Sequence, residues 1–414
     1  MAVTIVSFAQ THTPAYNNQY LVASSTNAAQ TNFKYVVTVE INGGTSVENT
    51  TLEVPPRPDN GFLYYNPQRI ARSSIKTEFH KDETTFFIPS LTQPSELKKV
   101  TVGIDEKYGS PVSGFGGVSS SYFIWNASYK NLSFADYVYS TTTSAKDLTL
   151  VPSLIDTIKY EQKYLFKTWH KGFSTRDLRY LYIESFDSSN NTIQVVTFEN
   201  PSYTVGAGSY NRNFLSLNVS PYGINNFSGT ITAKTNIGID NIPSNAAKYT
   251  MYFLDSSPAI SSNTYTVNID TMCSKFSRYV LHFLNTYGNW DSFTFNKLSR
   301  YNTDKDSDMF KKIPYSLNSV NKYTYDKSVN DTVVYNTVLT NKMTLNSNFI
   351  NETQASWLWD LLTSPDIKLE NSSGDIISVK CTNKNYESKK KVNDKLFNIT
   401  IEIENSLQDT RQGA

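Results

Sequence analysis

Apolar and polar residues alternate with a period of two over short runs along most of this chain, and this alternation constrains the fold more than any other feature. Residues 33–43, FKYVVTVEING, alternate until an Asn-Gly pair, and residues 396–405, LFNITIEIEN, alternate throughout. The inner faces of these runs are Tyr35, Val37, Val39 and Ile41 in the first, and Phe397, Ile399, Ile401 and Ile403 in the second. Such runs predict strands with one buried face.

Similar runs recur at short intervals in the middle of the chain. Residues 179–200, RYLYIESFDSSNNTIQVVTFEN, contain two alternating runs about a polar turn, and further runs follow before residue 270. The chain also contains 28 Tyr and 23 Phe, which favour strands, and lacks Ala-rich or Leu-rich helical blocks. Regularly spaced short strands with polar turns predict a mainly β fold of sandwich-like domains rather than βαβ units.

Residues 279–295, YVLHFLNTYGNWDSFTF, predict a structural hairpin. Asn, Gly and Asp supply turn conformations that β-branched residues resist. Gly288 is expected at positive φ, so replacing it with valine should cost roughly 1 kcal/mol or more. The expected core residues are Leu281, Phe283, Phe293 and Phe295.

Two helices are expected between the strands. Residues 66–75, NPQRIARSSI, predict a short one, in which Asn66 caps, Pro67 is the first helical residue and Ile70 faces inward. The second, at about 352–363, begins at a capping-box-like Asn351 and Gln354, and Pro365 ends it. Its expected inner stripe is Ala355, Leu358, Trp359 and Leu362.

A chain of 414 residues is too long for one ordinary core, and two to four domains are expected. The predicted division is an N-terminal β domain with a short helix at 1–147, a middle β domain at 148–270, and a C-terminal β domain with one helix at 271–414.

Charge and cysteine content indicate which partners and which compartment to expect. Lys and Arg number 38 against 37 Asp and Glu, a net charge of +1, which does not favour nucleic acid as the main partner. Cys273 and Cys381 are too few and too far apart for a disulfide framework, which suits a reducing cytoplasm. The N-terminal residues 1–16 lack a basic region and a long apolar run, so neither a signal peptide nor membrane insertion is predicted.

Residues 302–310, NTDKDSDMF, are the best metal candidate, because Asn302, Asp304, Asp306 and Asp308 alternate. The run lacks the glycine and the distal glutamate of an EF-hand loop, whether counting starts from Asn302 or from Asp304. The favoured interpretation is a solvated acidic loop, and no metal is predicted.

Other candidate sites are weaker. Glu78, His80 and Asp82 would lie on one face of a strand, but one His with two carboxylates is a poor metal signal, and an exposed strand end or loop is favoured. Cys273 and His282 could suggest a Cys-His pair, but packing roles are favoured. Trp357 and Trp290 could stack on sugars, whereas Trp359 is expected in the core.

No catalytic or cofactor-binding motif of the nucleophile-elbow, metalloprotease, P-loop or dinucleotide type is present. With four histidines, His12, His80, His170 and His282, acid-base chemistry would fall to carboxylates, and no pair of them stands out. The sequence therefore predicts a protein that is not an enzyme and has no catalytic residues or cofactor.

Several stretches resemble a family of structural tail, hub and baseplate proteins of bacteriophages that infect Bacteroidetes, including the crAss-like phages. The resemblance rests on TPAYNNQYLVASSTNAAQTNFKYVVTVEING with PPRPDNGFLYYNPQRI, on YVLHFLNTYGNWDSFTF, and on WLWDLLTSPDIKLE leading into the last hairpin. It implies a β-rich virion subunit, assembled in the host cytoplasm, usually as a ring around the tail axis.

The expected function is thus a non-enzymatic structural subunit of a phage tail, hub or baseplate, which self-assembles and docks other tail proteins. Its partners would be virion proteins and further copies of the chain, through loops such as 109–117, GSPVSGFGG, and 201–213, PSYTVGAGSYNRN. Two alternatives stay open: a receptor- or carbohydrate-binding protein at the tail tip, and a tail-associated enzyme that cuts capsule or peptidoglycan.

Overall fold

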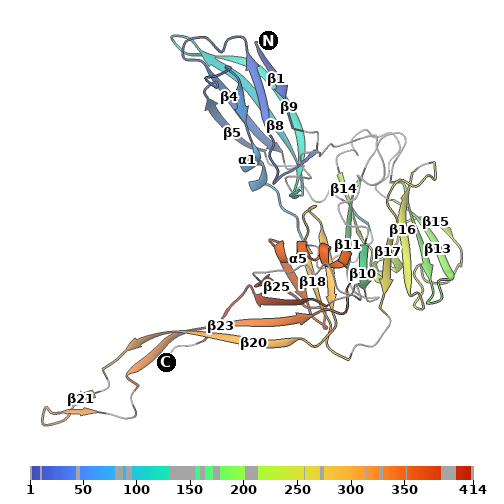
Figure 1. Ribbon diagram of the computed structural model, residues 1–414, viewed down its shortest axis with the longest axis vertical. Helices are drawn as coiled ribbons and strands as arrows, with labels where there is room; N and C mark the ends of the chain where they lie inside the picture. Colours follow the sequence, from blue (N-terminus) through green and yellow to red (C-terminus); the bar gives the residue numbers. More distant parts are fainter. Residues whose placement is uncertain are drawn as a thin grey trace. The chain divides into compact units, whose positions relative to one another are not determined.

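The computed structural model describes residues 2–9, 12–42, 47–79, 87–89, 96–129, 154–158, 164–170, 178–200, 213–255, 257–270, 275–313, 315–325, 328, 330–350, 352–383 and 398–411. Within them the fold is mainly β, as predicted, with short helices (Figure 1). The chain divides into a first unit, residues 1–272 with 284–292, and a second unit, residues 273–283 with 293–414. Buried apolar residues form three clusters, within 3–124, 125–269 and 279–403, while the predicted three-domain division stays a prediction.

The N-terminal part of the first unit is a sandwich of two sheets. One has the order β1 (Val3–Ser7), β3 (Leu21–Ser25), β6 (Leu63–Tyr65). The other has the order β2 (His12–Pro14), β9 (Ser113–Trp125), β8 (Leu97–Tyr108), β4 (Lys34–Asn42), β5 (Val47–Val54). The four alternating residues predicted for β4 are all buried between the sheets, so the period-two pattern of this strand is confirmed.

The short helix of this region is α1 (Gln68–Ser73), so the predicted element is present but begins one residue later than expected. Pro67 is the N-cap, and the Asn66 side-chain oxygen accepts the N–H of Gln68 at 3.1 Å. Ile70 packs against the core as predicted.

The glycine-rich segment 109–117 was expected as a loop, but only 109–112 form a turn, and β9 includes residues 113–117. Gly117 explains the difference. A β-bulge between Ile104 and Glu106 brings the partner strand so close that a Cβ at Gly117 would overlap the carbonyl of Ile104. Glycine here permits close pairing rather than a loop.

The remaining part of the first unit is a second sandwich. Its larger sheet has the order β10 (Leu154–Ile158), β17 (Tyr265–Ile269), β16 (Lys248–Leu254), β12 (Tyr180–Phe186), β13 (Thr192–Glu199), β15 (Ile231–Lys234). The smaller has the order β11 (Leu165–His170), β14 (Asn213–Asn218), β7 (Phe87–Pro89). Phe166 and Leu217 of the smaller sheet share a core with the inward residues of the larger. Helix α3 (Pro221–Asn225) begins at Ser220, whose hydroxyl caps the N–H of Gly223.

The second unit contains one large sheet covered by two short helices. The sheet has the order β19 (Trp290–Phe295), β18 (Tyr279–Leu284), β24 (Ile367–Glu370), β25 (Ile376–Cys381), β26 (Thr400–Asn405), β23 (Thr332–Asn346), β20 (Arg300–Lys311), and β27 (Asp409–Arg411) also pairs with β23. The predicted hairpin is thus confirmed as β18 and β19. Its four predicted core residues are buried, as are Ile399, Ile401 and Ile403 at the end of the chain, while Phe397 lies outside the described residues.

The expected single helix at 352–363 is divided into α4 (Glu352–Trp357) and α5 (Trp359–Thr363). The predicted stripe is partly wrong, since Ala355 and Leu358 are buried but Trp359 is 42% exposed. The buried residues of the two helices are Ala355, Trp357, Leu358 and Leu361, and Leu362 is half-buried against the same core. Trp359 is thus the member of the predicted stripe that lies outside the core, and Trp357 is buried in its place. The proposed cap Asn351 lies outside the described residues.

None of the helices in the ranges given above is long and apolar enough to cross a lipid bilayer.

Candidate assembly surface

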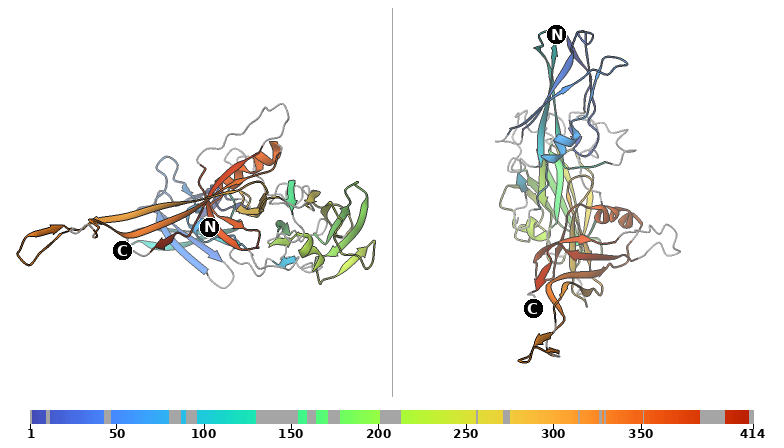
Figure 2. Two further views of the ribbon diagram at one scale, coloured as in Figure 1. Left: turned by 90° about the horizontal axis from the view of Figure 1, so that it is seen from below. Right: turned by 90° about the vertical axis from the view of Figure 1, so that its left-hand side faces the viewer.

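The second unit carries a long two-stranded ribbon, defined here as the arm, residues 300–346. Strands β20 and β23 pair from Arg300 opposite Thr344 to Lys311 opposite Thr332. Beyond them, the short strands β21 (Tyr315–Leu317) and β22 (Tyr323–Tyr325) form the far end of the ribbon (Figures 1 and 2). The arm is therefore a projection of the large sheet (Figures 1 and 2).

The arm has little core of its own. Strand β26 supports only Lys342–Asn346 of β23, and β27 supports Thr337–Leu339. In the described part of the chain, the rest of β23 pairs with β20 alone. Every residue of β20 except Ser307 is exposed. A ribbon of two strands is marginal in water, so additional contacts are expected to stabilise it.

Polar side chains link the two strands of the arm. Asp304 pairs with Lys342 at 2.6 Å, and Asn336 donates to Asp308 at 3.0 Å. The hydrogen bond to Asp304 raises the pKa of Lys342. These contacts lie at the surface, where screening by solvent keeps the contribution of each to stability small.

The acidic run at 302–308 was expected as a solvated loop, but it lies in strand β20, so the prediction of a loop is wrong. The predicted exposure of its acidic side chains is confirmed. Alternate strand positions are roughly 7 Å apart, whereas calcium ligands lie about 2.3–2.6 Å from the ion. Side chains in a straight row cannot easily converge on one ion. Among the described residues, no three His, Cys, Asp or Glu side chains are grouped to hold a metal.

The base of the arm is attached to the core of the second unit through two tyrosines. Tyr279 is 7% exposed, and its hydroxyl forms a hydrogen bond with the hydroxyl of Tyr301 on β20. Their rings meet edge to face, with centroids 6.3 Å apart. This contact fixes the first residues of the arm.

The far end of the arm, residues 309–335, is called the tip. Its turn is ordered by Asn318, whose side-chain oxygen accepts the N–H groups of Val320 and Lys322 at 3.1 and 2.9 Å. Large apolar side chains are exposed around this turn: Met309 57%, Phe310 48%, Ile313 67%, Val320 67%, Tyr323 75%, Tyr325 65% and Tyr335 57%. The chain thus holds a defined turn that presents an apolar, solvent-facing surface.

Charged side chains lie along both parts of the arm. The stem, residues 300–308, carries Asp304, Asp306 and Asp308 together with Arg300 and Lys305, so its charges nearly cancel. The described tip carries Lys311, Lys312 and Lys322 with Asp331, so it combines a positive charge with exposed aromatic side chains.

The structure describes the other sequence candidates only in part. Of the possible metal ligands Glu78, His80 and Asp82, only Glu78 lies among the described residues. Its backbone N–H donates to the side chain of Glu96. Cys273 also lies outside them, and His282 is buried with Nε2 2.7 Å from Glu370 Oε2, a packed polar contact within the sheet.

The tryptophans that could have stacked on sugars are buried. Trp290 is 3% exposed and packs against Phe79, and Trp357 is 7% exposed and packs against Phe283 and Phe293. The exposed helical tryptophan is Trp359, the one expected in the core.

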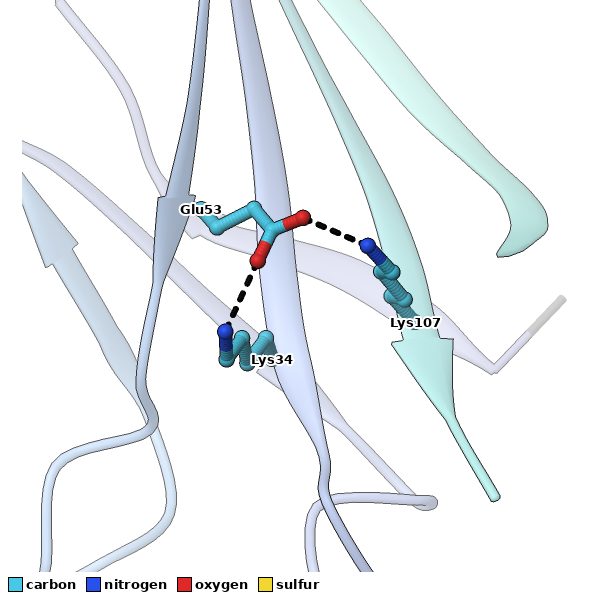
Figure 3. Close-up of polar contacts among 3 residues, drawn as sticks. All are labelled: Lys34, Glu53 and Lys107. Carbon is cyan, nitrogen blue, oxygen red and sulfur yellow. Dashed lines mark hydrogen bonds and ion pairs between the residues drawn. The ribbon is translucent and has the colours of Figure 1, made fainter. Parts of the chain in front are cut away.

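One cluster that the sequence did not indicate is the ion triad of Figure 3, in the first unit. Glu53 on β5 meets Lys34 on β4 at 2.8 Å and Lys107 on β8 at 2.6 Å. Hydrogen bonds from Lys107 and then Lys34 lower the pKa of Glu53 to about 2. The three residues are 19 and 54 positions apart and meet only because β4 is paired between β5 and β8.

No protein-family model and no curated protein matches the chain.

Proposed function

We propose that this protein is a non-enzymatic structural subunit of a bacteriophage virion, located in the tail, hub or baseplate, where copies of the chain assemble and dock other tail proteins. The single observation that carries the assembly part is the arm. Its exposed apolar tip has no role in the core of the second unit. The assignment to a phage tail rests on the sequence resemblance.

An exposed apolar surface on a projecting element is costly unless a partner covers it. The seven apolar side chains of the tip together expose on the order of 900 Å², comparable with one side of a standard protein–protein interface of roughly 800 Å². Exposed apolar side chains that gather on a projecting element are typical of interaction sites. A subunit that exists mainly within an assembly would keep such a surface covered.

The alternative is a receptor- or carbohydrate-binding protein at the tail tip. Burial of Trp290 and Trp357 removes two of the aromatic platforms that this alternative would use, while Trp359, Tyr323 and Tyr325 remain accessible. The alternative predicts saturable glycan binding that is lost when one of these three residues is replaced by alanine.

Immunogold labelling of intact phage particles from cells that express this gene tests the proposal. Labels at regular positions along the tail or baseplate are expected. Absence of the protein from purified particles, with abundant free protein in the lysate, would overturn it. A glycan array with wild-type protein and the Trp359→Ala variant separates the structural role from the receptor-binding role.

A further inference from the structure

We infer that a row of three outward side chains in the first unit, Tyr16, Asn18 and Tyr20, binds an uncharged oligosaccharide. The row lies in the segment 16–20, YNNQY, between strands β2 and β3. Tyr16 is 45% exposed and Tyr20 is 60% exposed, and Asn18 between them is also exposed. The inference goes beyond the proposed function and does not rest on it.

The two amide side chains that alternate with this row are buried and hold the segment in place. Asn17 donates to the carbonyl of Tyr129 and accepts the N–H of Tyr129, both at 2.8 Å. Gln19 donates to the carbonyl of Ala15 at 3.3 Å and accepts the hydroxyl of Tyr122. Because these contacts fix the segment before any ligand arrives, little conformational entropy is lost on binding.

The Asn18 amide presents its NH2 group outward. Asn66 Oδ1 accepts the N–H groups of Gln19 and Gln68, both at 3.1 Å, which fixes the orientation of the Asn66 amide. The Asn66 NH2 group therefore donates to Asn18 Oδ1, at 2.9 Å. Within the described part of the chain Asn18 Nδ2 makes no hydrogen bond, so its N–H donors are available to a ligand.

A third exposed tyrosine extends the row. Val22 of β3 pairs with Tyr64 of β6, and Tyr64 is 46% exposed on the outer face of this small sheet. Tyr20 precedes Val22 by two positions and lies on the same outward side. The Arg57 guanidinium lies 4.9 Å from the centre of the Tyr64 ring and pairs with Asp59 at 3.0 Å, so its charge is balanced.

The chemistry of the row indicates the class of ligand. Residues 1–33 contain no Lys, Arg, Asp or Glu, so the row offers no charge to an ionic ligand. A sugar ring has C–H groups on its faces, which pack against the electron-rich face of a tyrosine, and hydroxyls at its edge, which accept from an amide. An aromatic, amide, aromatic row is therefore complementary to an uncharged oligosaccharide.

The size of the surface favours a small ligand over a protein. The three tyrosines together expose on the order of 300 Å², well below the roughly 800 Å² that each side of a standard protein–protein interface covers. A few sugar units need only such an area, provided that a small number of polar groups fix their orientation.

A printed glycan array tests the inference on the full chain. The array carries uncharged gluco-, manno- and galacto-oligosaccharides together with uronic-acid and sulfated glycans. Wild type should bind uncharged members, and calorimetry with the strongest of them should show saturation. Tyr16→Ala and Tyr20→Ala should each weaken binding by about tenfold or more, whereas Tyr20→Phe, which keeps the ring, should stay within about twofold of wild type.

Asn18→Asp is the sharpest variant. Aspartate still accepts the hydrogen bond from Asn66 but has no N–H to donate, so binding should fall by about tenfold or more while the segment stays in place. The matched control is Tyr222→Ala on α3, a tyrosine that is 44% exposed elsewhere in the first unit, and it should leave binding unchanged. Trp359→Ala should also leave binding unchanged, which separates this site from the receptor-binding alternative.

Three results would overturn the inference: no uncharged glycan bound by wild type, binding that persists in the Tyr16→Ala, Tyr20→Ala double variant, or binding confined to acidic glycans. The last would point to cations such as Arg69 and Arg72 of α1, which are exposed. Circular dichroism of each variant should match wild type. Altered spectra for the alanine variants would transfer the decision to Asn18→Asp, and particle labelling is independent of all these outcomes.

Discussion

Gly288 lies against the backbone of Asn126, so close that a Cβ at Gly288 would be 2.5 Å from the carbonyl oxygen of Asn126. Both residues belong to the first unit, in which the turn 284–292 packs beside residues 125–129. The Ser128 N–H donates to the Thr286 carbonyl at 2.8 Å, and the Trp125 indole donates to the Tyr287 carbonyl at 3.1 Å. The glycine predicted from sequence as a turn residue is therefore also a packing residue.

Gly288→Ala should destabilise the first unit by more than backbone strain alone, by about 2 kcal/mol or more, because the residue has φ of 83° and no space for a Cβ. Gly288→Val should cost at least as much. The matched control is Gly238→Ala, which has φ of 93° but no neighbour within 4 Å and should cost only about 1 kcal/mol. Urea unfolding measures both, and equal losses would contradict the packing role.

The carboxyl of Glu53 should titrate near pH 2 rather than at its ordinary value of 4.5. Because the pKa in the folded state is lowered, the ion triad stabilises the fold fully above pH 4.5, and this contribution is lost as pH falls from 4.5 towards 2. Lys107→Met should raise the pKa of Glu53 more than Lys34→Met does. Carbon-detected NMR titration measures it, and an unchanged midpoint in Lys107→Met would refute the assignment.

Trp357→Ala should destabilise the second unit by about 3–5 kcal/mol, because the indole packs between Phe283 and Phe293 in the core. Trp359→Ala should change the free energy of unfolding by about 1 kcal/mol or less, because this side chain is 42% exposed. Denaturant unfolding of the two variants under one condition makes the comparison. Similar losses would mean that the original periodic stripe, with Trp359 inward, is correct.

Calcium at millimolar concentration should leave the melting temperature of the wild-type protein unchanged, because Asp304, Asp306 and Asp308 are spread along a strand. Removal of calcium with a chelator should likewise have no effect. The triple variant with asparagine at these positions is the control. A rise in melting temperature on adding calcium, in wild type but not in this variant, would show that the stem binds the ion.

Local sequence patterns predicted many strands well, because a strand with one covered face shows the alternation of apolar and polar residues within its own few residues. Strand β4, the hairpin of β12 and β13, and the last strand β26 followed from side chains that alternate between a covered and an open face. Strands β18 and β19 are buried on both faces, which alternation alone did not predict. Gly288 was correctly identified as a residue of the turn between them. Its contact with Asn126 was not predicted, because the two residues are 162 positions apart in the sequence.

By itself, the sequence determined that the chain is mainly β, where many strands lie, and that the acidic run at 302–308 is exposed, because these properties depend on neighbours within a few residues. Only the tertiary structure decided that Trp290 and Trp357 are buried while Trp359 is exposed, and that Glu53 lies between Lys34 and Lys107. It also decided that residues 300–346 form an arm with an exposed apolar tip. The physical reason is that burial, ion pairing and strand order are set by contacts between residues distant in the chain, and such contacts leave no local period.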